Sequence, residues 1–242
     1  MGRAYEVRKA SIQKTGAIKA KIYSTYAKEI YLAARAGVPE VEANVSLKRM
    51  VEKAKKNQVP SDIIERAINK AKGNVHEDYQ TVYYEIIGPS ASTVIVKCLT
   101  DNVNRTISFI REVNNKTKTK MAGLGSVSYN YDNLGILVFN TDKSDEIFEF
   151  LLNEGIEIID FETEGSEVTI TMLPTDVHKV KDVIDKVINN VDYIVDETGW
   201  YPKEKISLDG DNLVQFNKLI TMLEDIEDVS EVYHNVILDW KV

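Results

Sequence analysis

Residues 99–106 read LTDNVNRT, and the segments on either side of this stretch decide the fold. Residues 92–99 are rich in β-branched side chains, which predicts a buried strand. Over residues 107–113, apolar side chains recur at helical spacing. A short amide side chain accepts well from the free N–H groups of a first helical turn, so Asn102 or Asn104 is expected to cap this helix. The stretch is therefore predicted to join a strand to a helix.

Arg105 is expected to lie beside the unpaired N–H groups at the start of this helix, where the helix dipole favours an anion. A phosphate group is therefore one interpretation of the turn, and the other is that Asn102 and Asn104 only shape it. A long loop with glycines follows at residues 116–125, and such loops are often functional. Its three lysines either serve solubility or contact phosphate as point charges: Lys116, Lys118 and Lys120.

Taken together, several motifs resemble the YebC/PmpR family. Its members are described as transcriptional regulators or as translation factors, and they include a mitochondrial translational activator of cytochrome oxidase. The resemblance rests on LTDNVNRT and on GLGSV at 123–127. Upstream it is carried by KEI at 28–30, AARAG at 33–37, VP at 59–60, IERAI at 64–68, KG at 72–73, YE at 84–85 and GP at 88–89. The family commonly opens with a Gly-His-Ser-Lys-Trp run and a dense basic cluster, whereas this chain begins MGRAYEVRK and is similar to the shorter-headed subgroup.

Charge is distributed unevenly along the 242 residues. Residues 1–73 hold 16 Lys and Arg against 7 Asp and Glu, and the remaining 169 residues hold 14 against 31. The net charge of −8 therefore combines a basic head of +9 with an acidic body of −17. Such a chain is predicted to meet a polyanion in one orientation. The acidic body would then face away from the polyanion or meet a basic protein surface.

The head is predicted to contain three helices after a flexible basic arm at residues 1–16. Helical spacing places them at about residues 17–37, 43–57 and 62–72, with Ser61 as the candidate cap of the third. In the second helix, one acidic residue balances five basic residues that are predicted to face outward. Solvated lysines are the alternative, but this imbalance favours phosphate binding. The predicted nucleic-acid-binding residues are Arg3, Arg8, Lys9, Lys14, Lys19, Lys21, Lys48, Arg49, Lys53, Lys55 and Lys56.

Beyond a polar linker, the pattern changes to short strands and helices, so the fold class is predicted to be α+β. Residues 126–131 are predicted to form a strand and residues 132–135 a turn. The unit that follows reads β-α-β-β-α-β, the ferredoxin-like order. The last helix and strand, within residues 205–242, cannot form a domain alone and are expected to complete the sheet that begins near residue 81.

Three domains are therefore predicted, and the family resemblance implies the same layout. They are a basic helical domain at 1–80, an α+β domain at 81–134 plus 205–242, and an inserted ferredoxin-like domain at 135–204.

The sequence favours a non-enzymatic protein without metal or cofactor. The three histidines are far apart, and neither they nor the single cysteine show a metal-ligand spacing. Cys98 lies in an apolar strand and is expected to be buried and inert. A nucleophile triad is spatial and leaves no necessary trace in sequence. No apolar run is long enough to span a membrane and no secretion signal is visible, so a cytoplasmic protein without a membrane partner or small-molecule substrate is expected.

Two functions remain open at this point. The resemblance implies either a translation factor that binds the ribosome and its RNA, or a regulator of transcription that binds duplex DNA. The second and third predicted helices have a spacing that could mimic a helix-turn-helix. The third, however, offers at most Arg66, Asn69 and Lys70 for reading bases, which favours RNA. The acidic third domain is expected to contact a protein partner with either target.

Overall fold

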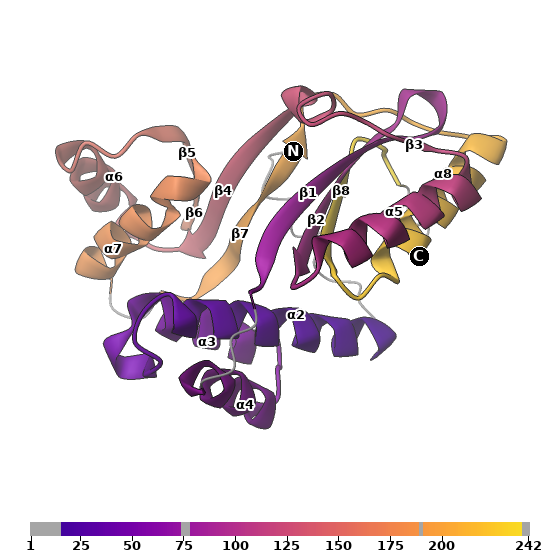
Figure 1. The fold of residues 1–242 in the computed structure, drawn as a ribbon. Helices are drawn as coiled ribbons and strands as arrows, with labels where there is room; N and C mark the ends of the chain where they lie inside the picture. Colours follow the sequence, from indigo (N-terminus) through magenta and orange to yellow (C-terminus); the bar gives the residue numbers. More distant parts are fainter. Residues whose placement is uncertain (1–15, 74–77, 189–190, 239–242) are drawn as a thin grey trace. The chain divides into compact units, whose positions relative to one another are not determined.

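The structure is a computed structural model that describes residues 16–73, 78–188 and 191–238, with side chains from residue 21 onward (Figure 1). The described chain groups into two compact units. One contains residues 128–205, and the other contains the described residues before and after that segment. Each unit has its own four-stranded sheet and apolar core. No helix in the described parts is long and apolar enough to cross a membrane.

The helical head consists of α2 (Gly16–Arg35), α3 (Val45–Lys56) and α4 (Ser61–Lys72), close to the predicted ranges. Asn44 caps α3, because its side-chain oxygen accepts from the N–H of Leu47 at 3.0 Å. The predicted cap of α4 is wrong: Pro60 occupies the cap position without a side-chain hydrogen bond, and Ser61 is already the first helical residue. Apolar side chains of the three helices form the core of the head: Ile30, Tyr31, Ala34, Leu47, Val51, Ala54, Ile64, Ala67 and Ala71.

The same unit contains an antiparallel sheet in the order β3-β1-β2-β8. Its strands are β1 (Gln80–Ile87), β2 (Thr93–Thr100), β3 (Lys120–Met121) and β8 (Val229–His234). Helices α5 (Val103–Thr117) and α8 (Gly210–Glu224) cover one face, where Ile110, Phe216 and Leu219 pack against the strands (Figure 1). Because β8 and α8 come from the end of the chain, the sheet is completed after the second unit, as predicted.

The second unit is ferredoxin-like. In chain order it contains β4 (Tyr131–Asn140), α6 (Ser144–Asn153), β5 (Ile158–Glu164), β6 (Glu167–Met172), α7 (Val177–Val187) and β7 (Tyr193–Pro202). The strands pair antiparallel in the order β5-β6-β4-β7. Residues of α6 and α7, including Ile147, Leu151 and Ile184, pack in one core with β4 and β6. The predicted α+β class with an inserted ferredoxin-like unit is therefore confirmed, and the exact domain boundaries stay a prediction.

The prediction for residues 126–135 is wrong. A short 3-10 turn at Ser128–Asn130 precedes β4, and the Asp-Asn-Leu-Gly stretch lies inside that strand instead of forming a turn. Gly135 pairs with both Met172 and Thr198. A Cβ atom at this position would lie 2.3 Å from Cγ2 of Val177. The glycine is therefore needed for the close approach of α7 to the strand, a role that the sequence does not distinguish from a turn.

Candidate nucleic-acid interface

The basic side chains of α3 do not all face the same way. Lys48, Lys55 and Lys56 are exposed, whereas Arg49 and Lys53 are half-buried. The prediction that all five face outward is therefore wrong for Arg49 and Lys53. Because Leu47, Val51 and Ala54 point into the core, positions 49 and 53 lie on the flank of the inward face. The outward cationic surface of α3 thus consists of three lysines.

The positive charge of Lys53 affects the ionisation of Glu29 on the neighbouring helix α2. Burial raises the pKa of the Glu29 carboxyl, and the positive charges of Lys97 and Lys53 partly offset that rise. Lys53 therefore compensates a half-buried acid within the head. Lys48 lies 4.0 Å from Glu42, and because both side chains are largely exposed, water and salt weaken this pair.

Helix α4 has an outward surface of mixed charge. The exposed Arg66 donates to the Asp62 side chain one turn earlier at 2.5 Å, so its guanidinium is held on its own helix. Glu65 is exposed beside them. The Lys70 ammonium lies 5.9 Å from the ring centroid of Tyr31. Of the three candidate base-reading residues, Arg66 and Lys70 are therefore engaged within the head, and Asn69 is exposed.

The remaining residues predicted in the head are only partly covered by the structure. Arg3, Arg8, Lys9 and Lys14 lie outside the described residues, and the side chain of Lys19 does as well. Lys21 is half-buried, and its ammonium donates to the backbone oxygen of Glu224 at the end of α8.

The turn between β2 and α5 is capped as predicted. Asn102 is the capping residue, with its side-chain oxygen accepting from the N–H of Arg105 at 3.0 Å. The backbone N–H of Asn102 donates to the hydroxyl oxygen of Thr100 at 2.9 Å. Asn104 is exposed within the first helical turn, and its backbone oxygen accepts from the hydroxyl of Ser108. The two asparagines of the motif therefore have different roles.

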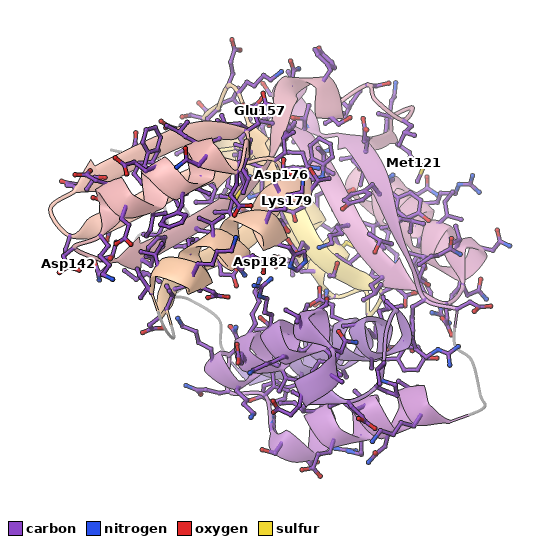
Figure 2. The ribbon with its side chains drawn as sticks, turned by 90° about the vertical axis from the view of Figure 1, so that its left-hand side faces the viewer. Met121, Asp142, Glu157, Asp176, Lys179 and Asp182 are labelled. Carbon is purple, nitrogen blue, oxygen red and sulfur yellow. The ribbon has the colours of Figure 1, made fainter. Side chains whose placement is uncertain are left out.

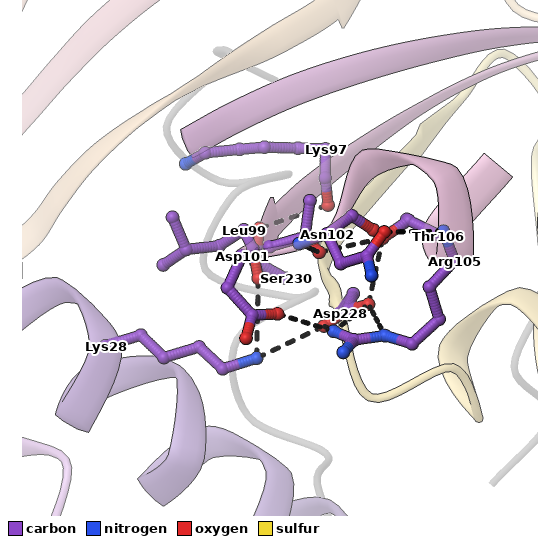
Figure 3. A network of polar contacts seen from close by, with 10 residues as sticks. Lys28, Lys97, Leu99, Asp101, Asn102, Arg105, Thr106, Asp228 and Ser230 are labelled. Carbon is purple, nitrogen blue, oxygen red and sulfur yellow. Dashed lines mark hydrogen bonds and ion pairs between the residues drawn. The ribbon is translucent and has the colours of Figure 1, made fainter. Parts of the chain in front are cut away.

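Arg105 lies between two carboxylates of the chain itself (Figure 3). Its Nη2 donates to Asp101 at 2.8 Å and to both oxygens of Asp228 at 2.9 and 3.0 Å. The side chain of Asp228 is only 4% exposed, and it also accepts from the hydroxyl of Thr106 at 2.9 Å. Lys28 of α2 completes the cluster, with its ammonium 3.5 Å from Asp228. The anion expected at this helix start is thus supplied from within the chain, and a phosphate contact by Arg105 stays a prediction.

The position of Asp228 explains its protonation behaviour. Burial alone would raise the pKa of its carboxyl, but hydrogen bonds from Arg105 and Thr106 and the charges of Arg105 and Lys28 hold it below its ordinary value. Asp228 is not predicted from the sequence, because it lies 123 positions after Arg105 and no local pattern singles it out.

The lysines of the predicted basic loop surround the end of α5. The helix continues to Thr117, beyond its predicted end, and Lys118 adopts the left-handed conformation that closes it, with φ of 53°. Lys116 is exposed and pairs with Glu112 at 2.6 Å. Lys118 and Lys120 are also exposed, the latter on the short strand β3. A residue that sequence reasoning missed, Lys218 of α8, approaches the backbone oxygen of Lys116 at 3.5 Å.

The ferredoxin-like unit has the opposite charge. Residues 128–205 contain 18 Asp and Glu against 6 Lys and Arg. Asp142, Glu157 and Asp182 are exposed and project from its surface (Figure 2). A contact between this unit and a basic protein partner stays a prediction.

Features of metal or thiol chemistry are not apparent in the described residues. No group of three or more His, Cys, Asp or Glu there could hold a metal ion. Burial raises the pKa of the Cys98 thiol to about 12, so it is a neutral core side chain near pH 7.

Comparison with known proteins covers the whole chain. The family model described as the TACO1/YebC protein N-terminal domain matches residues 3–74, and that of the TACO1/YebC second and third domain matches residues 79–236. A probable transcriptional regulatory protein of Alteromonas mediterranea is 41% identical over 98% of this chain and 99% of its own. One of Acholeplasma laidlawii is 43% identical over 98% of each chain. The crystal structure of a conserved hypothetical protein from Aquifex aeolicus aligns with a TM-score of 0.69 and 30% identity, over 93% of this chain and 92% of that one.

Proposed function

Because the chain belongs to the TACO1/YebC family, as its motifs predict, we propose that it is a nucleic-acid-binding regulator of gene expression. Its helical head binds phosphate groups, and the target is ribosomal RNA. The observation that carries this proposal is the outward row of Lys48, Lys55 and Lys56 on α3. Neutralised phosphates and released counterions supply most sequence-independent affinity for nucleic acids.

The surface chemistry of the head favours backbone contacts over base reading. A recognition helix in the major groove needs side chains whose donors and acceptors reach the base edges. On α4, Arg66 is bound to Asp62, and the exposed Glu65 would be repelled by phosphate. Lysines act as point charges and follow the phosphates of a folded RNA without requiring a sequence. A structured RNA is therefore the better match to this head.

Duplex DNA is the second candidate, and the names of the relatives favour it. The proteins of Alteromonas mediterranea and Acholeplasma laidlawii are both described as probable transcriptional regulatory proteins. The same lysines would serve on DNA, because the phosphate term does not depend on the sugar. The charge of the head therefore does not distinguish RNA from DNA. Binding to the two targets has to be compared directly under the same conditions.

The test is co-sedimentation with ribosomes from the source organism at two salt concentrations, beside binding to random duplex DNA in the same buffers. The variant Lys48→Glu with Lys55→Glu reverses two exposed charges. It is expected to weaken binding at least tenfold and to lower the salt slope by about 1.4 to 1.8, since each of two lost phosphate contacts contributes roughly 0.7 to 0.9.

A matched control, Lys143→Glu with Lys179→Glu, makes the same change of net charge on exposed positions of the ferredoxin-like unit. It should bind nearly as the unmodified protein does. Equal losses in both variants would mean that net charge, and not the face of α3, governs binding. If the protein binds DNA tightly and does not sediment with ribosomes, duplex DNA becomes the favoured target in place of ribosomal RNA.

A further inference from the structure

A buried carboxylate holds the glycine-containing loop that follows α5. The residue Glu85 on β1 is 4% exposed. Its Oε1 accepts from the N–H of Gly125 at 2.8 Å, and its Oε2 accepts from the N–H of Val127 at 2.5 Å. Its backbone oxygen accepts from the N–H of Ala122 at 2.8 Å. A buried carboxylate is costly unless it is hydrogen-bonded, so these bonds both satisfy the charge and fix the loop.

The loop so fixed presents one apolar side chain to solvent. Leu124 is 87% exposed, the highest value among the large exposed apolar residues of the described chain. It stands between Gly123 and Gly125, both exposed, and Gly125 has a φ of 87°, which an L side chain rarely adopts. The glycines therefore allow a tight turn that leaves Leu124 at its tip, where it cannot be stabilising the core.

Lysines precede this tip in the chain. Lys118 and Lys120 are exposed within the same loop, and Lys218 approaches the end of α5 from α8. A protein interface is normally built around a cluster of large apolar or aromatic side chains. Here the residues next to Leu124 in the chain are two glycines, followed by the exposed Ser126, so the loop itself supplies no second large apolar side chain beside it. A single apolar tip among lysines is better suited to a nucleic acid, in which base faces and phosphates lie side by side.

We propose that the loop at residues 118–127, positioned by Glu85, is a second nucleic-acid contact that takes unpaired nucleotides. Leu124 lies against an exposed base face or between two bases, and Lys118 and Lys120 contact the flanking phosphates. Base faces are hidden in an intact duplex but are exposed in RNA loops and bulges. Leucine side chains also enter between the base steps of a duplex, but there they must first unstack the bases, a cost that unpaired nucleotides do not carry. This inference rests on the proposed function, since it adds a second contact to a nucleic-acid-binding protein.

The experiment compares two probes, an RNA hairpin with an unpaired loop and a blunt duplex with the same stem. The unmodified protein should prefer the hairpin. Leu124→Ser is expected to weaken hairpin binding roughly five- to tenfold, as for partial burial of a leucine side chain, and to leave duplex binding unchanged. The matched control Val214→Ser changes another exposed apolar residue, on α8, and should alter neither affinity.

A second variant tests the positioning role of Glu85. Glu85→Gln replaces one acceptor by a donor that faces a backbone N–H, so the loop loosens while Leu124 remains. It should lower the hairpin preference without lowering duplex binding, provided that thermal unfolding shows an intact fold. A hairpin preference unchanged in Leu124→Ser, or absent from the unmodified protein, would overturn the inference. By contrast, if the variant Lys48→Glu with Lys55→Glu binds both probes as the unmodified protein does, the proposed function is overturned. The effect of Leu124→Ser on hairpin binding would then be judged independently.

Discussion

Helix α3 and the start of α5 both carry cations that the sequence predicts to bind phosphate. In the structure, these cations differ in how closely carboxylates of the chain pair with them. On α3, Lys48 and Lys55 are exposed, and Lys48 has only a distant acidic neighbour at 4.0 Å. At the start of α5, the side chain of Arg105 is 43% exposed, but its guanidinium donates to Asp101 and to the buried Asp228. The guanidinium of Arg105 would have to exchange its carboxylate partners for a phosphate, whereas Lys48 has only a weak, exposed pair to give up.

The two charged sites therefore differ in what they contact. The cluster around Asp228 joins the first turn of α5, the approach to β8 and helix α2 through Lys28 (Figure 3). It is therefore a structural junction within one unit. The lysines on the outer face of α3 are exposed side chains, so changes at the two sites should have opposite consequences for folding and for binding.

The largest effect is expected for Asp228→Ala. Removing one partner of a buried ion pair leaves Arg105 and Lys28 without their shared carboxylate, and such losses cost about 3 kcal/mol of unfolding free energy. Urea unfolding at pH 7 measures this loss. Asp101→Ala is the control, because its carboxylate binds the same arginine but is 42% exposed, and exposed pairs contribute up to about 1 kcal/mol. Similar losses for both variants would contradict the junction.

The contribution of Asp228 should also depend on pH. Because the pKa of its carboxyl is lowered in the folded protein, its stabilisation is complete above the unfolded-state value of about 3.9 and is lost as the pH falls further. The difference in unfolding free energy between the unmodified protein and Asp228→Ala should therefore stay constant from pH 7 to about pH 4 and narrow over the range from about pH 4 down to about pH 3. A constant difference over this range would mean that the carboxylate charge is not what stabilises the junction.

Within the motif itself, the two asparagines offer a smaller test. Asn102→Ala removes the hydrogen bond to the N–H of Arg105 and should lower the unfolding free energy by about 1 kcal/mol. Asn104→Ala leaves the cap intact and should change it by less than about 0.5 kcal/mol. Thermal or urea unfolding of the two variants measures these losses. A larger loss for Asn104→Ala than for Asn102→Ala would place the cap at Asn104.

The comparison also shows what the sequence can predict. Apolar periodicity and glycine stops predicted the helices of the head and the β-α-β-β-α-β order, because those patterns arise from local burial. The buried partner of Arg105 could not be predicted, since Asp228 reaches it only after the chain has returned from the ferredoxin-like unit. Gly135 was misread for the same reason: its close neighbour, Val177, lies on another element. Local pattern predicts elements, whereas contacts between distant elements decide which polar residues remain accessible.

The smallest effect on folding is expected for Lys55→Gln. Its comparison with Arg105→Gln tests most directly how the two sites differ. Lys55→Gln changes an exposed side chain and should alter the unfolding free energy by less than about 0.5 kcal/mol, while lowering the salt slope of nucleic-acid binding by roughly 0.7 to 0.9. Arg105→Gln should do the opposite, destabilising the fold and leaving the slope of the folded protein unchanged, because its guanidinium is bound to Asp101 and Asp228. Both quantities come from urea unfolding and a salt titration on the same samples. If Arg105→Gln lowers the slope as much as Lys55→Gln does, the turn contacts phosphate after all, and Asp228 must exchange its arginine with the ligand when nucleic acid binds.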